Sequence, residues 1–298
     1  LELLQSAEES GANYLFEASV GGGIPIIRPL CQCLAANYIE GIAGILNGTT
    51  NFILTMMIEK GMSFDEALKI AQEKGYAEKD PTADVEGHDA CRKVCILASL
   101  AFGKHVYPNQ VETEGITNIT LEDVSYIENA GGVIKLLGQI KYINDNEIAA
   151  FVSPAVVYNG SQLASVKDVF NAILVRGDAV GDVCFYGPGA GKLPTASAVV
   201  ADIIDCAKHS ERKKIFGWGA GNEDYVVDYK ERIEMPFYVR AKATPAEINA
   251  KFSDVKFLSR KGQPSDEVAF ITDIMTENKL NKKLDGINVI NTIKVTNY

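Results

Sequence analysis

Two periodicities of apolar residues alternate along the chain, and together they predict a mixed α/β protein. Helical spacing, with polar residues at the expected ends, predicts helices over 1–10, 25–36, 51–60, 66–74, 84–102, 120–130, 163–170 and 194–208. Alternating and β-branched runs predict strands over 14–20, 40–46, 136–143, 147–156, 173–179 and 182–186. Because several strands follow one another without an intervening helix, part of the sheet should be antiparallel, with helices covering it.

Polar residues mark where several of these helices begin. The Ser-x-x-Glu motif at 63–66 and the Thr-x-x-Asp motif at 120–123 are typical of capped helix starts. We expect Thr49 or Thr50 to cap the helix that follows the Asn-Gly turn at 47–48, and Asp84 to cap the long helix that ends near residue 102.

The pattern changes after a polar, glycine-rich linker over 209–234. From 235 to 298 the order is strand, helix, strand, strand, helix, strand, which is that of a ferredoxin-like unit. The predicted strands are 237–243, 255–261, 267–272 and 289–295, and the predicted helices are 245–252 and 273–284. We therefore expect a second, smaller domain at this end of the chain.

Composition narrows the classes of protein that fit. With 47% hydrophobic and 23% charged residues in 298, the chain resembles an ordinary globular protein and not a disordered one. A net charge of −10 without any basic run excludes nucleic acid and anionic membrane surfaces as partners. The uncharged run 41–58 contains Gly, Asn and Thr residues that break a membrane helix, and the acidic N-terminus is no signal peptide. A cytoplasmic protein is expected.

Cysteine and histidine residues give no sign of a zinc site or a disulfide framework. The six cysteines form no C-x-x-C pair, and the three histidines are scattered. Zinc sites need four such ligands at short spacings. We therefore expect reduced thiols, as is usual in cytosolic proteins.

The densest group of ionisable residues lies in the segment around Glu78, Asp84, Asp89 and Lys93. Asp89 and Lys93 are four residues apart, so on a helix they share a face and can pair. The residues after Lys93 are apolar on every side, and an ammonium at the start of a buried helix must be paired or line a wet cleft. Such a cleft would suit a zwitterionic amino acid and would provide an acid beside it. The alternative is a solvated helix start with an ordinary surface ion pair.

Two glycine-rich segments are further candidates. Three glycines follow Glu17, and the turn they allow could bring carbonyl oxygens and Glu17 around a hard cation; the alternative is a plain flexible turn. The glycines over 187–191 precede a predicted helix, which suits a phosphate group. Pro194 replaces the third glycine of the dinucleotide fingerprint, and Leu193 follows Lys192 where a P-loop needs Ser or Thr. This second pattern is therefore incomplete.

One segment resembles the signature of the homoserine dehydrogenase family. Its fixed positions are all filled, by Ala71, Gly75, Tyr76, Ala77, Asp80, Pro81, Asp84, Val85, Gly87, Asp89 and Lys93. The blocks FEASVGGGIPII, GILNGTTNFIL and YGPGAGKLPTA are similar to other blocks of that family. The resemblance covers about residues 1–208, and the tail is similar to an ACT domain by its element order.

The resemblance implies an activity and roles for the charged segment. The family reduces L-aspartate 4-semialdehyde to L-homoserine with NAD(P)H, on the way to threonine, methionine and isoleucine. Lys93 would be the general acid that protonates the carbonyl oxygen, where a positioned ammonium stabilises the developing charge. Asp84 and Glu78 would hold the amino acid and water, Asp89 would belong to the same polar cluster, and Thr49 would lie near the substrate or nicotinamide.

The resemblance also implies sites for a cation and for the cofactor. The turn after Glu17 would hold a monovalent cation, Na⁺, with ligands from Glu17, Val20, Gly22 and Ile24. The returning segment would approach NAD(P)H through Gly189, Ala190 and Gly191. A homodimer or higher homo-oligomer, and threonine as an effector at the ACT-like domain, are the implied partners besides the small-molecule substrate.

Two departures from the family pattern qualify these expectations. The chain contains neither a complete G-x-G-x-x-G nor the family's Ala-Asn-Lys lysine. We therefore expect most of the nucleotide-binding Rossmann domain to be missing from it. We expect 1–16 to be the tail of that domain, 17–208 the catalytic and dimerisation domain, 209–234 the linker and 235–298 the ACT-like domain. The chain alone should then be an inactive dimer. The effector loop at 243–246 reads Ala-Thr-Pro-Ala, without the usual glycine.

Two other interpretations remain open at this point. The chain could be a non-catalytic amino-acid-binding or sensing protein built from the same domains, which the missing nucleotide domain favours and the intact charged segment opposes. It could also be the C-terminal part of a bifunctional aspartate kinase–homoserine dehydrogenase.

Overall fold

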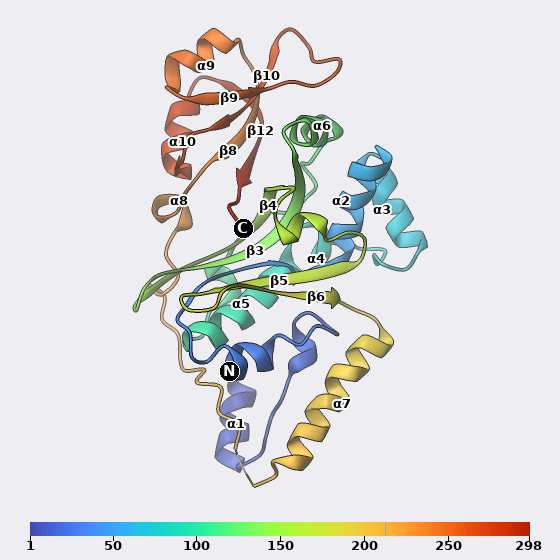
Figure 1. Ribbon diagram of the computed structural model, residues 1–298, viewed down its shortest axis with the longest axis vertical. Helices are drawn as coiled ribbons and strands as arrows, with labels where there is room; N and C mark the ends of the chain where they lie inside the picture. Colours follow the sequence, from blue (N-terminus) through green and yellow to red (C-terminus); the bar gives the residue numbers. More distant parts are fainter. Residues whose placement is uncertain (212) are drawn as a thin grey trace.

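A ten-stranded sheet runs through the whole molecule. The computed structural model describes residues 1–211 and 213–298, and Figure 1 shows helices on both sides of the sheet and at its two ends. Within those residues the strand order is β6 (Gly181–Pro188), β5 (Phe170–Gly177), β1 (Ile39–Ile45), β3 (Gly132–Asn144), β4 (Glu147–Tyr158), β12 (Asn288–Val295), β8 (Phe237–Lys242), β10 (Glu267–Thr272) and β9 (Val255–Leu258). The predicted α/β class with a mixed sheet, part of it antiparallel, is confirmed.

Most neighbouring strands are antiparallel. The exceptions in the described chain are β12, which pairs in parallel with β4, and the short β2 (Glu112–Thr113), which also pairs in parallel with β4. The long hairpin of β3 and β4 turns at 145–146. This hairpin forms the middle of the sheet, because β1, β5 and β6 add to the side of β3 and the C-terminal strands add to the side of β4.

One face of the sheet is covered by α2 (Gly48–Lys60) and α5 (His88–Phe102), with α3 (Phe64–Glu73) packed on α2. The approach of α5 is close because β3 carries Gly138, where a Cβ atom would lie 2.5 Å from Val94 Cγ2. Leu46, Val94 and Ile140 belong to the core that this packing encloses. The helix that carries Asp89 and Lys93 is thus anchored on the centre of the sheet.

The opposite face of these strands is covered by the loop 159–169 and by the C-terminal residue. Leu163 and Val166 pack with Ile45 and Leu174 in a separate apolar cluster. Tyr298 lies against β1, where a Cβ at Gly41 would be 2.5 Å from its hydroxyl oxygen. Both faces of the central strands are therefore buried.

The C-terminal residues form a ferredoxin-like unit, as the element order predicts. Its strands lie in the order β12-β8-β10-β9, all antiparallel, with α9 (Pro245–Lys251) and α10 (Glu277–Leu284) packed on one face. The other face lies toward α6 (Leu121–Asn129), as Figure 1 shows. The linker also holds α8 (Tyr229–Arg232), and β7 (Glu234–Met235) pairs with β11 (Met275–Thr276). The expected linker over 209–234 includes residue 212, which lies outside the described residues.

The N-terminal helix and the helix after β6 lie at the other end of the molecule (Figure 1). The helix α1 (Glu2–Ser10) ends at Gly11, whose φ is 71°, as predicted. The helix α7 (Lys192–Lys208) begins two residues earlier than expected. None of the helices in the described part of the chain is both long and apolar enough to span a membrane.

Several local predictions were wrong. The segment 14–20 contains a 3₁₀ turn, η1 (Glu17–Ser19), because the buried Glu17 side chain binds backbone amides of the same loop. The helix expected over 25–36 is one π-helical turn, η2 (Pro29–Cys33), and the one over 163–170 is a 3₁₀ turn, η4 (Gln162–Ser165). In each case apolar side chains that suggested a regular element instead anchor an irregular loop to the core.

The caps were predicted with mixed success. The capping boxes at Ser63 and Thr120 are present. Asn47, not Thr49 or Thr50, caps α2, because its side chain accepts a hydrogen bond from the amide of Thr50 at 2.9 Å.

The helix expected over 84–102 is two helices, α4 (Thr82–Val85) and α5, separated at Gly87. Gly87 has a φ of 81°, and a Cβ there would lie 3.0 Å from Thr113 Cγ2 and 3.3 Å from Val152 Cγ1. Asp84 therefore does not cap the long helix.

Candidate functional site

Lys93 lies one turn into α5, directly above Asp89 on the same face. Its Nζ donates hydrogen bonds to Asp89 Oδ2 at 2.7 Å and to the carbonyl oxygen of Leu46 at 2.8 Å. The Lys93 side chain is 19% exposed and that of Asp89 31% exposed. An ammonium group has three N–H donors, so one remains for a molecule that enters from solvent. The ion pair predicted from the spacing is confirmed.

Asn47 links this pair to Asp84. Its Nδ2 donates to Asp84 Oδ1 at 2.7 Å and to Asp89 Oδ2 at 2.9 Å. Asn47 lies between β1 and α2 and is 6% exposed. The Asn-Gly pair indicated only a turn here, although Asn directly before a helix is also a strong cap signal. Asp84, Asp89 and Lys93 are therefore brought together, through a residue that was missed.

The remaining predicted substrate residues, Thr49 and Glu78, lie on α2 and on the loop 75–81. Thr49 is in the first turn of α2, and its hydroxyl donates to the carbonyl of Tyr76 at 2.8 Å, which fixes the loop 75–81 beside the cluster. Glu78 lies on that loop with its side chain exposed, and its backbone carbonyl accepts a hydrogen bond from Gln72 at 3.1 Å. The Glu78 carboxylate is not part of the cluster.

Asp80 has a local role in the same loop. One of its carboxylate oxygens accepts from the hydroxyl of Thr82 at 2.6 Å and from the Thr82 amide at 3.1 Å. These two hydrogen bonds lower the pKa of Asp80. Asp80 thus shapes the start of α4 and does not reach the ammonium of Lys93 in this structure.

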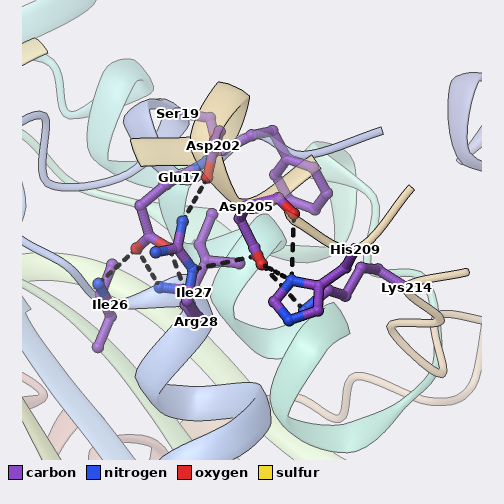
Figure 2. Close-up of polar contacts among 10 residues, drawn as sticks. Glu17, Ser19, Ile26, Ile27, Arg28, Asp202, Asp205, His209 and Lys214 are labelled. Atoms are coloured by element: carbon purple, nitrogen blue, oxygen red, sulfur yellow. Dashed lines mark hydrogen bonds and ion pairs between the residues drawn. The ribbon is translucent and has the colours of Figure 1, made fainter. Parts of the chain in front are cut away.

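The Glu17 carboxylate is occupied by backbone amides (Figure 2). Oε1 accepts from the amides of Ile26 and Ile27 at 2.6 and 2.8 Å, and Oε2 accepts from the amide of Arg28 at 2.9 Å. Glu17 is 4% exposed. A carboxylate that accepts three backbone hydrogen bonds is held in place, and most of its acceptor positions are already in use.

The turn after Glu17 has features that a cation site requires. Gly21 and Gly22 have φ values of 74° and 55°, which favour glycine. Val20, Gly22 and Ile24 are buried, and no backbone amide of the described chain donates to their carbonyl oxygens. Buried carbonyl groups usually have a partner. No group of three or more His, Cys, Asp or Glu side chains that could hold a metal occurs among the described residues.

The two glycine-rich segments meet. The Gly23 amide donates to the carbonyl of Pro188 at 3.1 Å, and a Cβ at Gly22 would overlap the carbonyl of Gly189. A Cβ at Gly189 would also overlap the side chain of Asn171. These glycines are thus explained by close backbone packing. Ala190 and Gly191 are exposed at the start of α7, where a ligand could reach them.

Two aspartates of α7 tie this helix to the same loop. Asp202 accepts from the Glu17 amide at 2.8 Å and pairs with Arg28 at 2.6 Å (Figure 2). Asp205 lies 3.7 Å from Arg28 of the same loop, and it also pairs with His209 at 2.7 Å and with Lys214 at 3.2 Å. Burial opposes ionisation of Asp205, but the hydrogen bonds from these two residues lower its pKa. The loop after Glu17 is therefore fixed from two sides.

Comparison with known proteins gives a consistent result. Residues 25–204 match the family model described as homoserine dehydrogenase. A homoserine dehydrogenase of Synechocystis is 49% identical over 207 residues, which are 68% of this chain and 48% of the relative. The crystal structure of a homoserine dehydrogenase from Thiobacillus denitrificans matches with a TM-score of 0.86 and 36% identity, over 99% of this chain and 73% of that one.

A further similar structure is that of a protein with a bound ligand. It is a hyperthermophilic archaeal homoserine dehydrogenase in complex with NADPH, with a TM-score of 0.59 and 32% identity over 70% of this chain and 59% of that one. The chain spans about half the length of the curated relatives it matches.

Proposed function

Since the chain belongs to the homoserine dehydrogenase family, we propose that it forms the substrate-binding and proton-transferring part of an oxidoreductase that interconverts L-aspartate 4-semialdehyde and L-homoserine. The observation that carries this proposal is the Lys93 ammonium, which is held by Asp89 and Leu46 and keeps one donor for an external acceptor. The carbonyl oxygen of the aldehyde is such an acceptor.

Lys93 would act as the general acid in reduction. As the carbonyl carbon is reduced, negative charge develops on the oxygen, and the positioned ammonium stabilises this charge and then donates the proton. In oxidation the neutral amine accepts the hydroxyl proton of homoserine. Asp89 holds the lysine in place, and Asp84 would bind the α-ammonium of the substrate. We keep Glu78 as a second ligand for this ammonium on the strength of the sequence motif.

The bound nicotinamide cofactor would supply the hydride. The exposed Ala190 and Gly191, with Gly189 before them, are our proposed contacts, and Thr49 would border the substrate. Gly191 has a φ of 119°, which only glycine adopts easily, so this loop cannot accept a side chain there. These features support a backbone approach to a ligand without identifying it as NADH or NADPH.

We also propose a monovalent cation, Na⁺, in the turn after Glu17. Its ligands would be the carbonyl oxygens of Glu17, Val20, Gly22 and Ile24. Support comes from the buried carbonyls that no backbone amide of the described chain satisfies. Anomalous scattering from crystals soaked in Rb⁺ or Tl⁺ should reveal the ion, and density typical of water with long contacts would contradict the site.

The domain assignment is part of the same proposal. We assign 1–16 to the end of a nucleotide-binding domain, 17–208 to catalysis and dimerisation, 209–234 to a linker, and 235–298 to an ACT-like domain with threonine as its effector. The protein would be a cytoplasmic homodimer. Light scattering and threonine titration of the protein test these assignments separately.

The decisive experiment compares wild type with Lys93→Met in the complete protein. Homoserine oxidation should fall about 10²–10⁴-fold with either NAD or NADP, because a general acid–base group is lost. Thermal unfolding should be unchanged, since Lys93 is partly exposed. Turnover within a few-fold of wild type would remove Lys93 from the mechanism. Homoserine binding without any turnover in wild type would favour the amino-acid-sensing alternative.

A further inference from the structure

We infer that Asn47 is a positioning residue, whose side-chain amide sets Asp84 and Asp89 in register with Lys93. This inference rests on the proposed function. It adds to the site a neutral residue that lies outside the charged segment from Glu78 to Lys93. Asn47 touches two of the three charged groups and adjoins the residue that holds the third.

The hydrogen bonds determine how the amide is oriented. Its oxygen accepts from the amide of Thr50 at 2.9 Å, so this atom must be the acceptor. Its nitrogen faces one oxygen each of Asp84 and Asp89, at 2.7 and 2.9 Å, so this atom must be the donor. The amide therefore uses both N–H groups on carboxylates and its oxygen on the helix, and no other side chain of this size supplies that combination.

The adjoining residue completes the arrangement. The carbonyl oxygen of Leu46 accepts from Lys93 at 2.8 Å, and the same Asp89 oxygen accepts from both Lys93 and Asn47. Leu46, directly after β1, thus holds the ammonium through its carbonyl oxygen, and the next residue, Asn47, holds both carboxylates through its side-chain nitrogen. Because β1 lies between β3 and β5 in the sheet, this junction is rigid.

The alternative is that Asn47 serves only as the cap of α2. Two substitutions separate the roles. Ser and Asp are good N-cap residues, so both Asn47→Ser and Asn47→Asp should keep the helix start. Neither can donate two hydrogen bonds to carboxylates, and Asp adds a third negative charge beside Asp84 and Asp89.

Kinetics of the complete protein give the first test. We expect kcat for homoserine oxidation to fall about 10–10²-fold in Asn47→Ser, because displaced catalytic groups cost about this much. In Asn47→Asp the rising limb of the pH–rate profile should move to higher pH, since the added carboxylate favours the ammonium form of its neighbour. A merely structural cap would move neither the profile nor the ratio of kcat to KM.

The matched control is Gly61→Ala at the other end of α2. Gly61 has a φ of 62° with open space around its Cβ position, so the substitution strains the helix end without touching the cluster. It should lower the midpoint of thermal unfolding while the pH profile stays as in wild type. Activity loss in Gly61→Ala equal to that in Asn47→Ser would reduce Asn47 to a helix cap and overturn the inference.

Chemical labelling gives a test that does not require turnover. The rate at which an acetylating reagent modifies Lys93, followed by mass spectrometry with the chain's other lysines as internal standards, should rise at least threefold in Asn47→Ser and fall in Asn47→Asp. The rate should rise in Asn47→Ser because the carboxylate partner of the ammonium is held less firmly. It should fall in Asn47→Asp because a further negative charge lies beside the ammonium. Equal labelling in all variants would overturn the inference even if homoserine is turned over. Absence of turnover in wild type, with the labelling pattern intact, would contradict the proposed function alone.

Discussion

Two polar clusters in this molecule contain nearly the same chemical groups, but one, around Lys93, is open to solvent and the other, around Asp123, is closed to it. In the first cluster, Lys93 lies with two carboxylates and an asparagine. The side chains of its central ion pair, Lys93 and Asp89, are 19% and 31% exposed. Around Asp123 at the start of α6, Arg240 lies 3.1 Å from the carboxylate, and this pair is 5% and 0% exposed. Asn291 donates to Asp123 at 2.9 Å, as Asn47 does to the first cluster.

The difference lies in how many hydrogen-bonding positions remain open. Asp123 also accepts from the hydroxyl of Tyr238 at 2.9 Å and from Thr120, so both of its oxygens are in use. Burial and the neighbouring Asp123 raise the pKa of Tyr238, which keeps that hydroxyl a donor. The closed cluster joins the C-terminal unit to α6, whereas the open one offers a donor to solvent. The same chemical groups thus serve cohesion in one place, and in the other they leave a donor open for the ligand binding that we propose.

Removing the central carboxylate should therefore affect the two clusters very differently. Asp123→Ala leaves the buried hydroxyl of Tyr238 unpaired and leaves the buried Arg240 guanidinium with only Glu122, at 3.7 Å. We expect the free energy of unfolding to fall by about 3–5 kcal/mol. Asp89→Ala should cost less than about 1 kcal/mol, because its partner can turn to water. Urea unfolding of both variants measures this, and equal losses would show that the contrast in exposure carries no energetic difference.

The rate of catalysis, unlike the stability, should depend strongly on Asp89 in the open cluster. Asp89→Asn keeps the size of the side chain but removes the charge that holds Lys93, and we expect kcat for homoserine oxidation to fall about 10²-fold, equivalent to about 2.7 kcal/mol. Thermal unfolding should change little. The conservative control is Asp89→Glu, which should recover part of the rate. If Asp89→Asn keeps full kcat, the open cluster does not position the lysine.

Lys135 in β3 extends the comparison, because it is a buried cation that contacts no carboxylate among the described residues. It is 2% exposed and donates to Asn51 Oδ1 and to the carbonyl of Val166. Burial, followed by the charge of Lys167, lowers its pKa to about 8. The unfolded chain, with an ordinary lysine pKa, therefore binds more protons than the folded one between about pH 8 and 10.5.

Stability should thus rise with pH across this window, since it increases wherever the unfolded state binds more protons. The contribution of Lys135 between pH 8 and 10 should be about 1–2 kcal/mol. Lys135→Met should abolish this gradient relative to wild type, whereas the exposed Lys69→Met should retain it. The check is urea unfolding of all three proteins at several pH values, and parallel curves for wild type and Lys135→Met would rule out this assignment.

The smallest expected effect lies far from both clusters, at the start of α3. The Ser63 hydroxyl accepts from the Glu66 amide at 3.3 Å, and the Glu66 side chain accepts from the Ser63 amide at 2.9 Å. Ser63→Ala should cost about 1 kcal/mol of stability without changing kcat, and Ser63→Asp should restore the cap. A change in kcat would indicate that α3 is coupled to the open cluster.

The features that could be predicted from the sequence are those formed between residues close together in the chain. The cap at Thr120 and the pair of Asp89 with Lys93 follow from spacings of three and four residues, and both are present. The order of strands and helices in the C-terminal unit was likewise correct.

What depends on distant partners was not predicted. Asp123 was expected as a capping residue, but its contacts with Tyr238 and Asn291 come from more than a hundred residues away. Asn47 was missed for the same reason, because its partners lie on α4 and α5. The break at Gly87 depends on side chains of Thr113 and Val152, which no local pattern reveals.

The parallel pairing of β12 with β4 has a consequence for how the chain acquires its structure. Lys294 lies opposite Ala155, so the two partners are 139 positions apart. Contacts of such high sequence separation form slowly, since a long loop must close before they stabilise anything. Translation adds about 5–20 residues per second, and an apolar strand edge that waits unpaired can associate with other chains. The edge of β4 near Ala155 therefore stays open for seconds during synthesis, and this is the interval in which a chaperone would have most to protect.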